Sequence, residues 1–106
     1  MQEDLIFEED CRTLLARLMC EIDHHTARRL RERIDERLFL IKPEVLVLDF
    51  SAVRFMDSSG IGLILGRAEA SSEIGAIVRI KGLSPTLSKI IRLSGVDKVK
   101  NISICK

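Results

Sequence analysis

The run Asp57-Ser58-Ser59-Gly60 is where the residue types of this chain suggest chemistry. It follows an apolar segment, 45–48, and precedes a segment with helical spacing. Side-chain oxygens of Asp and Ser accept hydrogen bonds from the free N–H groups of a helix's first turn. From spacing alone, a capped helix start is the simpler interpretation. The alternative is that one of these serines, Ser58, is also a switch that takes a phosphate, since a hydroxyl at a helix start is accessible to a kinase.

Other chemistries fit the sequence poorly. The glycines Gly60-x-Gly62-x-x-x-Gly66 are one residue too widely spaced for a dinucleotide fingerprint, and no phosphate loop ending in Gly-Lys-Ser/Thr occurs. A hydrolase could combine Ser58 with His25 and Asp57. However, Ser58 lacks the G-x-S-x-G elbow, and Asp57 is its direct neighbour, which is poorly placed to orient a histidine against it. We therefore expect a non-enzymatic protein without a cofactor, and a small hydrolase using Ser58 remains the weakest alternative.

The two adjacent histidines, His24 and His25, lack a third ligand at metal spacing, so we expect no metal site. The three cysteines are an odd number without a C-x-x-C pair, which favours a reducing compartment. The acidic start, 1–10, is unlike a signal peptide, and no apolar stretch approaches a membrane span. These features predict a cytoplasmic protein.

Length and charge narrow the class of protein further. A chain of 106 residues predicts a single domain, 1–106. Its 17 basic and 16 acidic residues give a net charge of +1, so no general attraction to nucleic acid or to a membrane surface is expected. The absence of Trp and Tyr also argues against a stacking platform for single-stranded nucleic acid.

The elements that must position Ser58 follow from hydrophobic periodicity and from helix start and stop signals. Asp23 is a candidate N-cap, Lys42-Pro43 ends the first helix, Ser84-Pro85 starts the last one and Gly95 ends it. The predicted order is strands at 5–7 and 14–19, a helix at 23–41, a strand at 44–50, a helix at 59–73, a strand at 76–80, a helix at 84–95 and a strand at 99–105.

This order predicts an α/β fold with a mainly parallel, mixed sheet of about five strands and helices packed mainly on one face. Functional residues of such folds usually lie where strands lead into helices. Asp57-Ser58 and Asp23-His24-His25 both lie at such points, so we expect them to be close in space.

The predicted helices differ in composition. The first has an apolar stripe and an outer face of mixed charge that we interpret as solvated, with the stripe formed by Ala27, Leu30, Ile34, Leu38 and Ile41. The second should turn Ile61, Ile64, Leu65 and Ala68 inward. Its three glycines cost about 1 kcal/mol each relative to alanine. We expect close approach to a neighbouring backbone to compensate for that cost.

Several segments together resemble a known family. The block Asp57 to Arg67, the upstream stretch Leu18 to Thr26 and the later segments 83–85 and 93–96 closely resemble the anti-sigma factor antagonists of spore-forming bacteria. These belong to the STAS domain family. The match spans nearly the whole chain, and it implies a STAS-like fold for 1–106.

The resemblance implies a partner-switching regulator of transcription. In the family, the serine that matches Ser58 is phosphorylated by a protein that is both serine kinase and anti-sigma factor. The unphosphorylated antagonist binds that protein and releases the sigma factor, and a serine phosphatase resets the phosphorylated form. The partner-binding residues that this implies surround the phosphorylation loop: Asp23, His24, Asp57, Ser59, Gly60 and Gly62. The alternative is a STAS interaction module of another signalling assembly or of a transporter.

Two departures from the family pattern occur. The family commonly has glycine where this chain has Cys20, which leaves the shape of the turn before Asp23 open. Many relatives also carry a further C-terminal helix after the last strand, so the coverage of one sheet face is open as well. The switch motif itself is intact.

Overall fold

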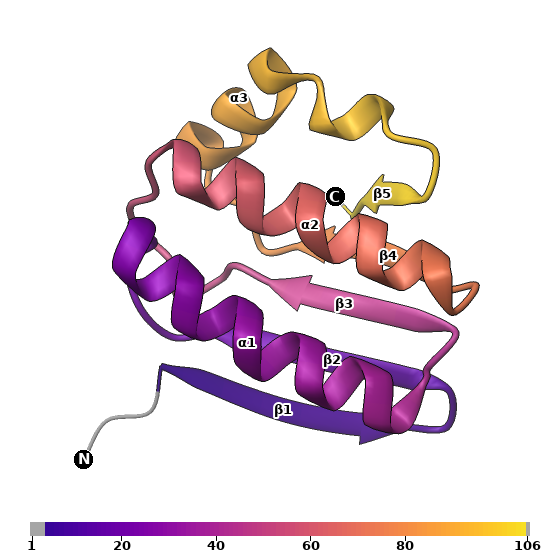
Figure 1. Ribbon diagram of the computed structural model, residues 1–106. Coiled ribbons are helices and arrows are strands. Elements are labelled where there is room, and N and C mark those ends of the chain that lie inside the picture. Colours follow the sequence, from indigo (N-terminus) through magenta and orange to yellow (C-terminus); the bar gives the residue numbers. More distant parts are fainter. Residues whose placement is uncertain (1–3, 106) are drawn as a thin grey trace.

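The computed structural model describes residues 4–105 and confirms the predicted order of elements (Figure 1). The strands are β1 (Leu5–Asp10), β2 (Thr13–Leu18), β3 (Val45–Asp49), β4 (Ile77–Lys81) and β5 (Ile102–Ile104). The helices are α1 (His24–Ile41), α2 (Ser58–Glu73), α3 (Pro85–Ser94) and the short 3-10 helix η1 (Val96–Lys98). The last strand is shorter than the predicted 99–105, because the turn at 99–101, which follows η1, occupies the start of that range.

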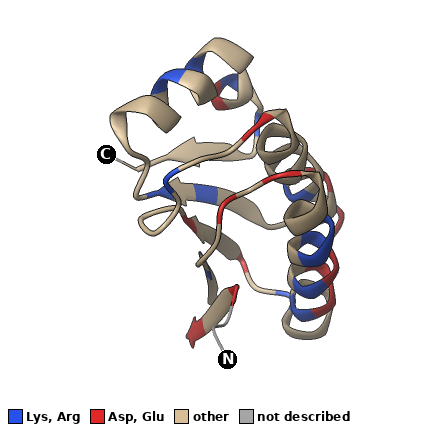
Figure 2. Ribbon diagram, turned by 90° about the vertical axis from the view of Figure 1, so that its left-hand side faces the viewer, with Lys and Arg blue, Asp and Glu red and all other residues tan. Residues whose placement is uncertain are grey.

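The five strands form one sheet in the order β1-β2-β3-β4-β5. β1 runs antiparallel to β2, and the other neighbours are parallel, so the predicted mixed, mainly parallel sheet is confirmed. Connections between neighbouring parallel strands are almost always right-handed. Here each of these connections leads to the next strand in the same direction across the sheet. This explains why α1 and α2 lie side by side on the same face (Figures 1 and 2), while α3 lies at the β5 end.

The core lies between this face of the sheet and the helices. Along α1, Leu30, Ile34 and Leu38 are buried, and the remaining stripe residues, Ala27 and Ile41, are half-buried, as predicted. Alternate residues of the central strands are buried toward the helices: Leu14, Ala16, Leu18, Leu46, Leu48, Val78 and Ile80. The buried side chains at every second strand residue and at every third or fourth residue of α1 therefore pack together in one apolar layer.

The prediction for the inner face of α2 is partly wrong. Ile64 and Ala68 are buried and Ile61 is half-buried, but Leu65 is 41% exposed. Leu63 and Arg67 are buried instead. The reason is that α2 packs against α1 as well as against the sheet, which turns a second side of the helix inward (Figure 1).

The predicted role of two α2 glycines is also wrong. A Cβ atom added to Gly62 or Gly66 would meet nothing within 4 Å, apart from chain neighbours and the helix itself. These glycines therefore do not serve close approach of α2 to a neighbouring backbone. Gly60 is different, because its added Cβ would lie 2.5 Å from the sulfur of Met56, a buried side chain beneath the helix start. The tight contact at Gly60 is with a side chain, which sequence spacing does not reveal.

Asp49, the last residue of β3, is buried at the end of the strand where the chain turns toward α2. Its Oδ1 accepts a hydrogen bond from the N–H of Ser51 at 2.9 Å, and its Oδ2 accepts one from Nε of Arg17 at 3.1 Å. Burial by itself raises the pKa of Asp49. The hydrogen bonds from Ser51 and Arg17 and the charge of Lys81 outweigh this, so the pKa lies below its ordinary value.

We expect Asp49→Asn to lower the free energy of unfolding by about 2 kcal/mol at pH 7, because it removes charge-assisted hydrogen bonds. A carboxylate with a lowered folded pKa stabilises the fold above its unfolded pKa of about 3.9, and this stability is lost as the pH falls through the folded value. The difference in the free energy of unfolding between Asp49→Asn and wild type should therefore become smaller as the pH is lowered. Urea unfolding at pH 7 and pH 3 measures this, and a constant difference would contradict the assignment.

Candidate functional site

Two loops at the carboxyl ends of β2 and β3 are joined by a short piece of parallel pairing. Ile22 and Met56 form an isolated bridge. The N–H of Ile22 donates to the carbonyl of Phe55 at 3.0 Å, and the N–H of Asp57 donates to the carbonyl of Ile22 at 3.0 Å. Both bridge residues are buried. The bridge therefore fixes the start of α1 relative to the start of α2.

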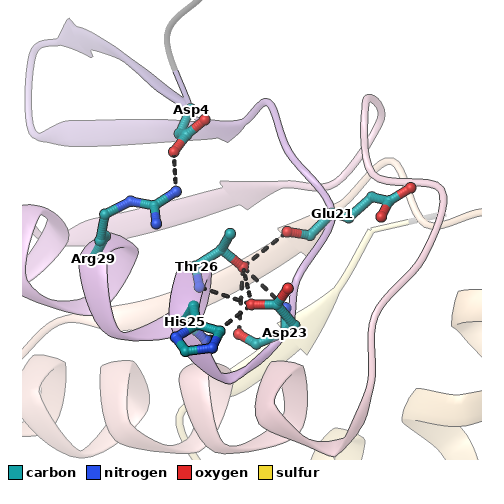
Figure 3. A network of polar contacts seen from close by, with 6 residues as sticks. All are labelled: Asp4, Glu21, Asp23, His25, Thr26 and Arg29. Atoms are coloured by element: carbon teal, nitrogen blue, oxygen red, sulfur yellow. Dashed lines mark hydrogen bonds and ion pairs between the residues drawn. The ribbon is translucent and has the colours of Figure 1, made fainter.

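Asp23 follows the bridge directly and caps α1 (Figure 3). Its Oδ1 accepts hydrogen bonds from the N–H groups of His25 at 2.8 Å and Thr26 at 2.9 Å, and its own N–H donates to the hydroxyl of Thr26 at 2.9 Å. That hydroxyl donates to the carbonyl of Glu21 at 2.8 Å. The backbone hydrogen bond from Thr26 is the main cause that lowers the pKa of Asp23, so its carboxylate is charged. The predicted cap is confirmed.

Asp57 caps α2 in the same way, accepting the N–H of Ser59 at 2.7 Å. Of the three candidate capping residues in the sequence, Asp57 therefore takes this role, and the hydroxyls of Ser58 and Ser59 cap no helix N–H in the part of the chain that the structure describes. Ser58 is the first residue of α2 and is exposed. Its hydroxyl makes no hydrogen bond to any residue in 4–105. The serine is thus held rigidly by its backbone while its oxygen faces solvent.

A groove of about 530 Å³ lies between the first turns of α1 and α2, beside this exposed serine. Its lining includes three predicted site residues, His24, Ser59 and Gly62. The other lining residues are Ala27, Arg28, Arg31, Leu63, Gly66 and Arg67. The fold therefore gathers the predicted site residues at one end of the α1–α2 pair: some on the groove, and Asp23, Asp57, Ser58 and Gly60 at the helix starts.

An ion pair below the groove was not anticipated from the sequence. Arg67 of α2 is 4% exposed, and its Nε lies 2.7 Å from Oδ1 of Asp35 on α1. Its Nη2 donates to Oδ2 of the same carboxylate at 3.1 Å, and its Nη1 donates to the carbonyl of Leu63 at 3.3 Å. The sequence pattern assigned Asp35 to a solvated face. The spacing of Arg67 from Ile64 could have indicated a buried guanidinium on α2, but nothing in the sequence identifies Asp35 as its partner.

We expect Asp35→Ala to lower the free energy of unfolding by about 3 kcal/mol, because it leaves the buried guanidinium of Arg67 without its partner. A matched control is Glu32→Ala. Glu32 pairs with Arg28 on the same helix at 3.6 Å, but both side chains are mostly exposed, so the loss should be about 0.5 kcal/mol or less. Chemical unfolding measures both. Equal losses would show that the Arg67 pair contributes no more than a surface pair.

The geometry around Ser58 gives no support to the hydrolase alternative. Within residues 4–105, no group of three or more His, Cys, Asp or Glu side chains is placed to hold a metal ion. The ring of His25 stacks at 4.0 Å on that of His24 and makes no hydrogen bond to Ser58 in this part of the chain. Asp57 is engaged with the helix N–H of Ser59. Among residues 4–105, none of the helices has the length and hydrophobicity that a membrane-spanning segment needs.

Cys20 departs from the glycine that is common in the family, yet the turn here does not require glycine. Among the described non-glycine residues, positive φ occurs only at Cys11 and Lys42. The thiol of Cys20 is half-buried, and burial raises its pKa, so it is a neutral, partly packed side chain. The turn therefore reaches Asp23 with ordinary backbone geometry.

The chain thus has a mixed five-stranded sheet with an exposed serine at the start of α2. The family model described as "STAS domain" matches residues 5–103, and the chain therefore belongs to the STAS domain family. The anti-sigma F factor antagonist of Paenibacillus polymyxa is 35% identical over 89 residues, which cover 84% of this chain and 76% of that protein.

Two solved structures are similar over nearly the full length. The anti-sigma factor antagonist SpoIIAA in its unphosphorylated form has a TM-score of 0.80 and 29% identity, covering 96% of this chain and 88% of that one. The Bacillus cell fate determinant SpoIIAA in the phosphorylated form has a TM-score of 0.72 and 29% identity, covering 96% and 91%. The predicted fold class and the resemblance to anti-sigma factor antagonists are confirmed.

Proposed function

We propose that this protein is an anti-sigma factor antagonist that works by partner switching in the cytoplasm. Its unphosphorylated form binds an anti-sigma factor and releases the sigma factor. The anti-sigma factor is also the serine kinase that phosphorylates Ser58, and a serine phosphatase restores the free hydroxyl. The protein acts as a regulated binding module and not as an enzyme.

The observation that carries the proposal is the exposed hydroxyl of Ser58 at the start of α2, which makes no hydrogen bond within the described residues 4–105. A kinase can reach this oxygen without unfolding the domain. The Asp57 cap and the Ile22–Met56 bridge hold the surrounding backbone in one geometry, so a partner meets a preformed surface. Relatives named anti-sigma factor antagonists, with a solved structure in each phosphorylation state, support the same assignment.

The geometry also supports a local mechanism for the switch. A phosphate on Ser58 adds a charge of about −1.5 to −2 at neutral pH. At the N-terminus of α2 that charge is favoured by the helix dipole, although the neighbouring Asp57 opposes it in part. The antagonist itself should therefore keep its structure. The partner, in contrast, must desolvate and face a dianion where it formerly met a neutral hydroxyl.

The surface that we assign to the anti-sigma factor surrounds Ser58 and includes Asp23, His24, Asp57, Ser59 and Gly62. Gly60, the other residue assigned to partner binding, is buried against Met56 and acts through the shape of the helix start. Asp23 and Asp57 fix the two helix starts, so they shape this surface as well as contributing to it. His24 and Gly62 are exposed beside the groove and are accessible to a partner.

The test uses the purified chain, the anti-sigma factor encoded in the same genome and its sigma factor. Adding the unphosphorylated chain to the complex of anti-sigma factor and sigma factor should release the sigma factor, measured by size-exclusion chromatography. Incubation with ATP should then add one phosphate, and mass spectrometry should locate it on Ser58 and not on Ser59. Failure to displace the sigma factor would remove the proposed function. A phosphate on Ser59 alone would move the switch by one residue.

A further inference from the structure

The groove between α1 and α2 carries positive charge that the described residues leave partly uncompensated. Arg28, Arg31 and Arg67 all line it. Arg28 has a surface pair with Glu32, and Arg67 is paired with Asp35. Arg31 is exposed and has no carboxylate within 4.0 Å in residues 4–105. Three guanidinium groups therefore share two carboxylates at this groove.

The electrostatics of the buried Arg67–Asp35 pair are consistent with an excess of positive charge at the groove. Burial lowers the pKa of Arg67, Asp35 counteracts the effect, and the positive charge of Arg31 lowers the pKa further. Arg31 is thus close enough to Arg67 to repel it. A second anion in the groove would relieve this repulsion, since Asp35 is already engaged by Arg67.

The shape of the groove depends on two glycines that the packing of the fold does not need. Gly62 and Gly66 line it, and at both positions an added Cβ would meet no neighbouring group within 4 Å. Each costs the helix about 1 kcal/mol relative to alanine. Larger side chains at these positions would project into the space between the helices. The glycines therefore keep the groove open to an occupant.

We propose that this groove receives acidic side chains from a segment of the anti-sigma factor, next to its contact with Ser58. The inference deepens the proposed function and rests on it. Carboxylates suit the site because guanidinium groups bind them through charge-assisted, often bidentate, hydrogen bonds. An acidic segment also explains the direction of the switch, since a phosphate at the rim of the groove would repel it.

The experiment measures the affinity of the purified anti-sigma factor for wild type, Ser58→Asp and three further variants of the full chain by isothermal titration calorimetry. Arg31→Glu should weaken binding about 30-fold, because it places a like charge opposite the acidic segment. Gly66→Leu should weaken binding about tenfold by filling the groove, while raising the thermal midpoint through its higher helix propensity. Arg79→Glu is the matched control. It makes the same charge change on the exposed side of β4 and should alter affinity less than twofold.

The outcomes separate this inference from the proposed function. If wild type binds and Ser58→Asp does not, but Arg31→Glu and Gly66→Leu bind like Arg79→Glu, the groove has no part in binding and only the inference is overturned. If wild type itself does not bind the anti-sigma factor, both are overturned. Inorganic phosphate is titrated in parallel into wild type and Arg31→Glu. Phosphate binding that depends on Arg31, with unchanged affinity for the partner, would make the groove a small-anion site and would also overturn the inference.

Discussion

Phosphorylation of Ser58 is expected to weaken binding to the anti-sigma factor by about 3 to 4 kcal/mol, or two to three factors of ten. The reason is local, since the partner must bury a dianion at the point where it contacts the start of α2. Ser58→Asp carries a single negative charge and should lose at least about tenfold in affinity. Ser58→Ala should bind as wild type does but should accept no phosphate.

The matched control for this substitution is Ser72→Asp, which introduces the same charge at the opposite end of α2 on an exposed residue. It should leave the affinity within about twofold. Phosphorylation should also leave the structure of the antagonist itself unchanged, because the N-terminus of α2 accommodates the phosphate. Thermal unfolding of the phosphorylated protein should therefore show a change in the free energy of unfolding of about 1 kcal/mol or less. Equal affinities of Ser58→Ala and Ser58→Asp for the partner would contradict the switch.

Gly82→Ala is expected to destabilise the fold by about 3 kcal/mol. Gly82 follows β4 with φ of +77°, a conformation that costs other residues about 1 to 2 kcal/mol. An added Cβ would also lie 2.7 Å from both Oδ1 of Asp49 and the backbone N of Ser51. The Ser51 backbone cannot move aside without breaking its hydrogen bond to Asp49, in the turn that leads toward Ser58.

Gly75→Ala separates the two contributions to this loss. Gly75 has a similar φ of +74°, but its added Cβ would meet nothing within 4 Å. Gly75→Ala should therefore lower the free energy of unfolding only by the cost of the left-handed backbone conformation, about 1 kcal/mol. Urea unfolding of both variants measures the difference. If Gly82→Ala costs no more than Gly75→Ala, the close approach of β4 to the turn after β3 is not a stabilising feature.

Local patterns in the sequence were sufficient for much of the fold. Caps and stops act within one turn of a helix, so the roles of Asp23, Ser84 with Pro85, and Gly95 could be predicted from adjacent residues and are confirmed. The apolar stripe of α1 depends only on helix periodicity, and the strand at β4 was predicted from its apolar residues and the preceding Gly75. The alternation of strands and helices also predicted the mainly parallel sheet, whereas the order of its strands came from the structure. The assignment of Ser58 as the phosphorylation site stays a prediction.

Contacts between distant segments were decided only by the tertiary structure. Arg67 and Asp35 are 32 residues apart, and neither helix's own periodicity indicates that they meet. The sequence predicted that the two helix starts lie close together, but it did not predict the Ile22–Met56 bridge that joins them. Leu65 and the α2 glycines were misjudged because the packing of α2 against α1 depends on where the sheet places both helices. The sequence by itself therefore determined the elements and the candidate serine, while the pairing of α1 with α2 created the buried ion pair and the charged groove.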